Sequence, residues 1–130
     1  MIVLDTHALV YDALAPVRLS VRARKAIDHA FATRELAYCD ISLWEIAMLV
    51  ARDRLDPGMD ARQFLDDLIA ARRLQVLPIT PEIAVLSQSD AFSHGDPADR
   101  LIAATALYHR AQLVTSDSRL RKLTQIATVW

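Results

Sequence analysis

Four acidic residues stand at points in this sequence where a carboxylate could hold a metal ion. Each follows a short apolar run or opens the apolar segment after it: Asp5, Glu45, Asp99 and Asp117. Carboxylates gathered in one place repel one another and raise each other's pKa unless a cation neutralises them. Hard divalent ions with oxygen ligands suit such a cluster, so the expected occupant is Mg²⁺ or Mn²⁺.

Such a site supports one reaction class above others. Two ions roughly 4 Å apart, or one ion with ordered water, can activate a hydroxide and stabilise the charge that develops on a phosphodiester. The acids therefore predict metal-assisted hydrolysis of nucleic acid. His7 and His94 lie near the acids in sequence but lack a partner at metal-ligand spacing, so we interpret them as supporting or structural residues. We interpret Trp44 as a core residue.

The stretch 96–100 shows how the fold would present these acids. Pro97 suits the first position of a helix over about residues 97–110, and Asp96 before it suits the N-cap. Asp99 then falls in the first helical turn, where the positive end of the helix dipole favours its ionised form. The segment behind it is apolar almost all round, which indicates a buried helix.

Each acid also has a purely structural explanation as a helix-start residue. Glu45 and Ser42 have the spacing of a capping box, Asp96 is an N-cap, and Asp117 could cap the next turn. What favours a site is that several of them are expected at the same edge of one sheet.

Apolar strands alternating with helical patterns predict an α/β fold, with a mainly parallel central sheet of four or five strands flanked by helices. The expected strands are residues 2–4, 36–39, 74–79, 112–115 and 126–129, and Pro78 suggests that the third lies at an edge. In parallel sheets, ligands bind beyond the carboxyl ends of the strands, where the following helices begin. This topology places all four acids at that edge.

Composition bounds the protein class. The 130 residues are 53% hydrophobic and 24% charged, which predicts one folded domain over residues 1–130. A net charge of −1 gives no sign of a nucleic-acid binder, yet thirteen of the fifteen basic residues are Arg, whose planar fork suits phosphate. The single Cys39 excludes an internal disulfide. With no apolar run of about 18 residues, we expect a soluble cytoplasmic protein without a membrane span.

Four motifs in this order resemble a PIN-domain ribonuclease of the VapC toxin type, and the resemblance covers the whole chain. The motifs are Asp5-Thr6-His7, Ser42-Leu43-Trp44-Glu45-Ile46-Ala47, the stretch from Asp96-Pro97-Ala98-Asp99-Arg100 to Ala106, and Leu113-Val114-Thr115-Ser116-Asp117. The second and third are the specific ones. Members often carry a Lys shortly after the second motif, where Met48 and Leu49 stand here.

The resemblance implies a Mg²⁺- or Mn²⁺-dependent endoribonuclease, usually dimeric and inhibited by a small cognate antitoxin. Its catalytic and metal-binding residues would be Asp5, Glu45, Asp99 and Asp117. Supporting roles would fall to the hydroxyls of Thr6 and Ser116 and to Asp96. From sequence adjacency and the fork geometry of Arg, we further expect Arg100, Arg119 or Arg121 to contact substrate phosphates.

Two alternatives remain at this point. An aspartyl-phosphate phosphatase would also place an Asp after its first strand, but it needs a second Asp two residues later, where this chain has His7. A non-catalytic binding module could keep the fold and use the acidic edge to receive a basic partner, although all four acids are intact.

Overall fold

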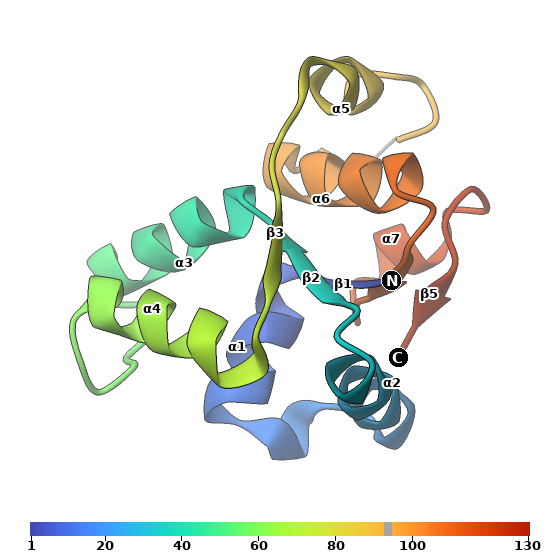
Figure 1. The fold of residues 1–130 in the computed structure, drawn as a ribbon. Coiled ribbons are helices and arrows are strands. Elements are labelled where there is room, and N and C mark those ends of the chain that lie inside the picture. Colours follow the sequence, from blue (N-terminus) through green and yellow to red (C-terminus); the bar gives the residue numbers. More distant parts are fainter. Residues whose placement is uncertain (93–94) are drawn as a thin grey trace.

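The computed structural model describes residues 1–92 and 95–130. Within these residues, five parallel strands form one sheet in the order β3-β2-β1-β4-β5 (Figure 1). Their bounds are Ile2–Leu4 for β1, Leu36–Cys39 for β2, Gln75–Leu77 for β3, Gln112–Val114 for β4 and Thr128–Val129 for β5. The predicted α/β fold with a parallel central sheet is thereby confirmed.

Helices cover both faces of the sheet. Over the described residues they are α1 (Thr6–Leu14), the short 3₁₀ helix η1 (Pro16–Arg18), α2 (Val21–Ala32), α3 (Ile41–Ala51), α4 (Ala61–Arg72), α5 (Pro81–Leu86), α6 (Pro97–Tyr108) and α7 (Ser118–Arg121). The expected helix at 97–110 therefore begins at Pro97 as predicted.

Alternating strand residues point to opposite faces of the sheet and contribute to two separate apolar cores. Leu4, Tyr38 and Val114 pack with α1 to α4 on one face. Val3 and Leu113 point to the other face, against α5, α6 and α7. Because both faces are covered, the central strands are continuous apolar runs, as buried parallel strands usually are. The sheet is thus a rigid base for whatever projects from its ends.

Edge strand β3 is shorter than the predicted 74–79. It ends at Leu77, immediately before Pro78, which has no N–H to donate to a neighbouring strand. Two of its three residues, Gln75 and Val76, are exposed. The proline signal for an edge position is therefore confirmed.

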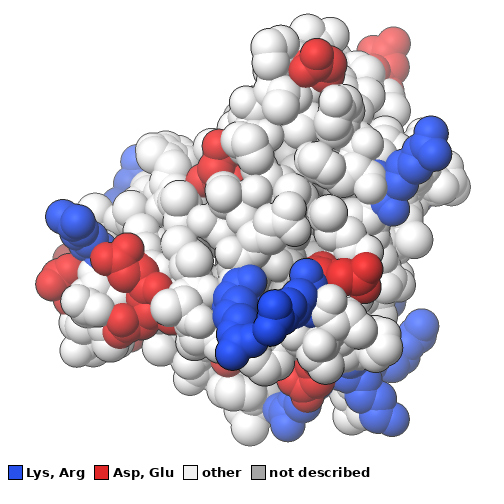
Figure 2. Space-filling view, in the orientation of Figure 1, with Lys and Arg blue, Asp and Glu red and all other residues white. Residues whose placement is uncertain are grey.

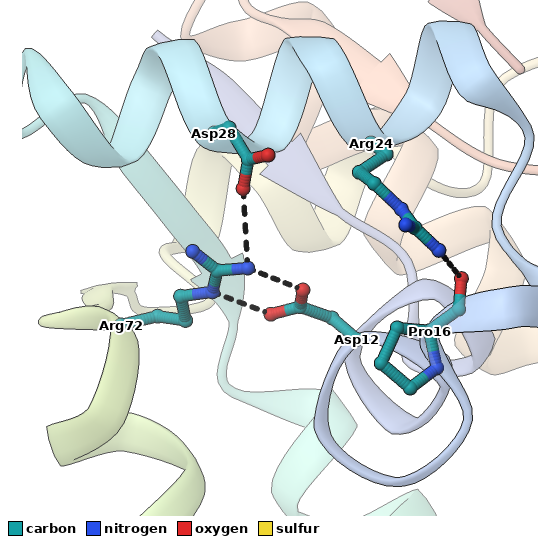
Figure 3. Close-up of polar contacts among 5 residues, drawn as sticks. All are labelled: Asp12, Pro16, Arg24, Asp28 and Arg72. Atoms are coloured by element: carbon teal, nitrogen blue, oxygen red, sulfur yellow. Dashed lines mark hydrogen bonds and ion pairs between the residues drawn. The ribbon is translucent and has the colours of Figure 1, made fainter.

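A charged cluster joins the first, second and fourth helices (Figure 3). Arg72 at the end of α4 donates two hydrogen bonds to the Asp12 carboxylate of α1, at 2.8 and 2.9 Å, and lies 3.3 Å from Asp28 of α2. The Asp12 side chain is only 8% exposed. Asp12 raises the pKa of Arg72, chiefly through these hydrogen bonds. The cluster fastens the end of α4 to the rest of its layer.

Two predictions around α3 are wrong. The helix begins at Ile41, so Ser42 lies inside it instead of capping it, and the Asp40 side chain at the N-cap position makes no capping hydrogen bond. The buried Ser42 hydroxyl instead lies 2.9 Å from the Thr6 hydroxyl. Trp44, predicted in the core, is 58% exposed, because the buried side of α3 is formed by Ser42 and Ile46.

Candidate active site

Asp5 lies at the end of the central strand and is almost fully buried, with 4% of its surface exposed. One of its oxygens accepts a 2.7 Å hydrogen bond from the Ala8 N–H, so Asp5 is the N-cap of α1. The Thr115 hydroxyl also hydrogen-bonds the carboxylate. Burial nevertheless raises the pKa of Asp5, and the charge of Asp117 adds to the rise.

Glu45 reaches toward Asp5 from α3. Its Oε1 accepts a hydrogen bond from the Thr6 hydroxyl, and because Thr6 has only one proton to give, Ser42 donates to Thr6 in turn. Burial raises the pKa of Glu45, with the charges of Asp96 and Asp5 acting in the same direction. Residues far apart in sequence therefore form one polar chain that fixes the Glu45 carboxylate.

The start of α6 carries the acids that its sequence predicted. Asp96 is the N-cap, and its Oδ1 accepts from the N–H groups of Ala98 at 2.9 Å and Asp99 at 3.3 Å. Asp99 lies in the first turn of α6 and is half-buried. The predicted capping role of Asp96 is confirmed, and its charge also acts on Glu45.

Asp117 follows β4 and caps α7. Its Oδ1 accepts from the N–H groups of Arg119 at 2.8 Å and Leu120 at 3.1 Å. The expected supporting hydroxyl, Ser116, is exposed, whereas the preceding Thr115 is fully buried. Thr115 accepts from the Asp117 N–H and hydrogen-bonds Asp5, so it links two of the acids.

Sequence reasoning misses Thr115 because its local signal is ambiguous. It closes an apolar run and therefore has the pattern of a last strand residue. Its position next to Asp5 depends on β1 and β4 being paired in register, Leu4 opposite Val114. Thr115 lies one residue beyond Val114 and therefore stands opposite Asp5, the residue that follows Leu4.

The basic residues near these acids differ in their surroundings. Arg100 donates its Nε–H to the Ser87 carbonyl oxygen at 2.8 Å, which ties α6 to the end of α5. Arg119 and Arg121 are exposed on α7. His7 is exposed on α1, and its charge lowers the pKa of both Asp5 and Glu45. His94 lies outside the described residues.

The donor chemistry of this edge fits a hard divalent cation. Its ligands would be carboxylate oxygens. The charge of Asp117 raises the pKa of Asp5, and the charges of Asp96 and Asp5 raise the pKa of Glu45, effects that a bound cation would relieve. Within residues 1–92 and 95–130, no three His, Cys, Asp or Glu side chains are grouped as a preformed metal site. Each of three carboxylates instead holds a helix start through one oxygen: Asp5, Asp96 and Asp117.

A match to a family model over most of the chain identifies the class of protein that carries this acidic edge. Residues 2–125 match the family described as the PIN domain. The chain belongs to the PIN-domain family. The curated relatives include Ribonuclease VapC22 of Mycobacterium tuberculosis, which is 39% identical over 132 residues that cover 99% of this chain and 98% of that protein. The family suggested by the four sequence motifs is thereby confirmed.

Solved structures agree on the fold of this PIN domain. The crystal structure of VapBC2 from Rickettsia felis, bound to a DNA fragment from its promoter, superposes with a TM-score of 0.72 at 18% identity, covering 99% of this chain and 98% of that one. FitAcB from Neisseria gonorrhoeae gives a TM-score of 0.65 at 22% identity, covering 100% and 97%. At these identities the likeness concerns the fold alone.

Proposed function

We propose that this protein is the toxin of a toxin-antitoxin pair and that it cleaves RNA with a divalent cation held by Asp5, Glu45, Asp99 and Asp117. Membership of the PIN-domain family, together with 39% identity to a ribonuclease over almost the full length, makes the chain a VapC-type ribonuclease. The cation, its ligands and the RNA are the proposed part.

The observation that carries the proposal is the shared electrostatics of acids from separate elements. The charge of Asp117 acts on Asp5, and the charges of Asp5 and Asp96 act on Glu45, which supports a shared site for acids from α3 and from the ends of β1 and β4. A purely capping acid gains nothing from being near other carboxylates. Burying Asp5 and Glu45 with raised pKa values is costly in the metal-free protein, and a bound cation would offset that cost.

The chain's own groups would hold and orient this site. Thr6 fixes Glu45 by donating to it, and Thr115 fixes Asp5. Such outer contacts commonly determine how well a ligand side chain meets its ion. When bound, Mg²⁺ or Mn²⁺ would supply an activated water and neutralise charge on the phosphodiester. The N-termini of α1 and α6 lie at the same edge, and their positive ends favour an approaching phosphate.

Substrate contacts are proposed for Arg119 and Arg121, which are exposed next to Asp117, and for Arg100. Arg100 already donates one N–H to Ser87, so it would use its remaining donors. Alanine variants at these positions should weaken RNA binding at low salt, and unchanged affinity would remove the assignment.

An antitoxin is the proposed protein partner. The similar solved structures include VapBC-1 from Haemophilus influenzae and a toxin-antitoxin complex from Klebsiella pneumoniae, which supports such a partner for this chain. A homodimer remains a prediction from the resemblance. A cytoplasmic location is also proposed; within the described residues, the helices are too short or too polar to span a bilayer.

The test is RNA cleavage by the purified protein with Mg²⁺, with Mn²⁺ and with EDTA. We expect cleavage only with metal, and loss of cleavage in Asp99→Asn and Asp117→Asn. The control is Asp66→Asn, an exposed acid on α4 whose partner is Arg62 at 4.0 Å. Metal binding without cleavage would favour the non-catalytic binding module, and a trapped phosphoryl group on Asp5 would favour the phosphatase.

A further inference from the structure

Arginine occupies three backbone positions where glycine is ordinarily favoured. In the described chain, the non-glycine residues with positive φ are Arg34 at 59°, Asp53 at 55°, Arg73 at 49° and Arg110 at 53°. Each follows the end of a helix, respectively α2, α3, α4 and α6. A side chain makes this left-handed conformation costly, which is why glycine is the usual residue at such helix ends.

The backbone arrangement at the four positions is the same. At each one the next residue donates its N–H to the carbonyl five residues back: Glu35 to Ala30, Arg54 to Leu49, Leu74 to Ile69 and Ala111 to Ala106. This is the hydrogen bond of a Schellman helix end, for which glycine is the favoured residue. The backbone conformation and its hydrogen bonds by themselves therefore give no reason to prefer a large side chain.

The three arginines share a location that Asp53 does not. Each stands two residues before a strand: Arg73 before β3, Arg34 before β2 and Arg110 before β4. In the parallel sheet these strand starts lie along one edge, opposite the edge that carries Asp5 and Glu45. Asp53 instead precedes the connection between α3 and α4. Lys and Arg side chains can be seen beside the junction of α4 with β3 in Figure 2.

The spacing of this row follows from the sheet. Neighbouring strands are about 4.8 Å apart, so Arg73 and Arg34 are one strand step apart and Arg110 lies two steps further, a row of roughly 15 Å. All three side chains are exposed, and within the described residues none of them is in an ion pair. Glu35 is the acidic neighbour, next to Arg34 in sequence. The row therefore presents unpaired guanidinium groups to solvent.

We propose that Arg34, Arg73 and Arg110 bind phosphates of an RNA substrate at a distance from the cut site. The proposal rests on the ribonuclease function proposed above. A polyanion approaching an acidic site needs cations elsewhere on the protein, and this chain's net charge of −1 supplies no general attraction. Backbone strain kept at three arginines, where glycine would relieve it, is consistent with a binding role for their side chains.

The row also predicts which RNAs can use it. From Arg34 to Asp40, at the far end of β2, there are six residues, or roughly 20 Å of extended chain. An RNA must therefore extend beyond the cut site by roughly this distance, about 20 Å, to reach both edges. Short substrates would use the acidic edge alone.

A cation near a helix C-terminus is also favourable in itself, so these arginines have a structural explanation. The two explanations predict different results for glycine variants. The test compares the triple variant Arg34→Gly, Arg73→Gly, Arg110→Gly with the matched control Asp53→Gly. If the arginines bind RNA, the triple variant should melt at the wild-type temperature or a few degrees higher and yet bind RNA less tightly.

Binding is measured at low salt and in EDTA with a pool of RNAs of about 30 nucleotides, so that cleavage does not interfere. We expect a loss of about tenfold or more for the triple variant, and a salt dependence whose slope falls by about two, from roughly 0.7 per lost phosphate contact. Asp53→Gly should melt higher and bind as tightly as the wild type. Equal RNA affinity and equal salt slope for triple variant and wild type would overturn the inference.

Two further measurements keep the outcome clear. The triple asparagine variant, which removes the charges with a residue that tolerates this conformation, replaces the glycine variant if that one fails to fold. Cleavage of an RNA of about four nucleotides should be unchanged in the triple variant, whereas cleavage of the long RNA should need a higher concentration. A wild-type protein that cleaves neither RNA contradicts the proposed function itself, whereas cleavage of both with the same KM in the triple variant contradicts only the arginine row.

Discussion

Replacing Asp5 with asparagine separates the two roles of this residue, because asparagine caps a helix about as well as aspartate does but carries no charge. The carboxylate accepts from the Ala8 N–H at 2.7 Å, and the asparagine oxygen can accept the same bond. What the variant loses is a charge that burial and Asp117 both disfavour. In EDTA at pH 7, Asp5→Asn should therefore be at least as stable as the wild type.

The sign of the pH dependence follows from the raised pKa of Asp5. A carboxyl whose pKa is higher in the folded than in the unfolded protein binds more protons when folded, so its contribution to stability falls as pH rises from its ordinary value of 3.8 through the raised value. Glu45 acts in the same direction. The metal-free wild type should thus lose stability toward neutral pH through both groups, and Asp5→Asn should lose less.

The expected shifts in Tm follow from the chain length. With an unfolding entropy of about 2.1 cal/mol/K per residue, 130 residues give a shift in Tm of about 4 °C per kcal/mol. Asp5→Ala, which also removes the cap, should melt about 4 °C below Asp5→Asn, for a cap of about 1 kcal/mol. Mn²⁺ at about a hundredfold excess over its Kd adds roughly 2.7 kcal/mol, or about 10 °C, to the wild type.

The assay is thermal unfolding of wild type, Asp5→Asn and Asp5→Ala in EDTA and in Mn²⁺, from pH 5 to pH 8. The asparagine variant should gain far less from Mn²⁺ than the wild type and should not cleave RNA. An equal gain from Mn²⁺, or an asparagine variant as unstable in EDTA as the alanine variant, would refute the reasoning that joins the buried charge to a cation.

Further variants test the supporting contacts. Thr6→Val removes the donor to Glu45 and should weaken Mn²⁺ affinity by about tenfold, whereas unchanged affinity in a calorimetric titration would show that Thr6 does not position Glu45. Arg72→Gln leaves the buried Asp12 carboxylate without its bidentate partner. Because Arg72 is partly exposed, the free energy of unfolding measured by chemical denaturation should fall by about 2 kcal/mol. The variant should still cleave a short RNA. A free energy of unfolding within about 0.5 kcal/mol of the wild-type value would contradict this prediction for Arg72.

Sequence patterns predict the fold because its strong signals are local. Continuous apolar runs such as residues 2–4 and 36–39 identify strands that are buried on both faces, and Asp96-Pro97 marks a helix start. Once the strands are parallel, the acids after them must share an edge, which is why the sequence pattern alone places Asp5 and Asp117 together. The sequence patterns predict β3 and β5 to be longer than they are, because these edge strands pair on one side only.

The errors come from contacts between distant residues. Ser42 and Glu45 have capping-box spacing, but the helix begins one residue before Ser42, and Thr6 from another helix takes both side chains as partners. Nothing near Ser42 in sequence indicates that its hydroxyl contacts Thr6. Residue type alone assigns Trp44 to the core, although burial on a short helix depends on which of its sides meets its neighbours.

Capping and cation binding are not competing explanations for the acids of this edge. In a parallel sheet, every helix that follows a strand begins at the same edge, and a helix start needs an acceptor for its unpaired N–H groups. Asp5, Asp96 and Asp117 each satisfy this need through one named oxygen. The cap restricts the rotation of the side chain and so holds the carboxylate at the site. A substitution that preserves the charge but not the cap should therefore weaken cation binding as well, since the ligand would lose the contact that orients it.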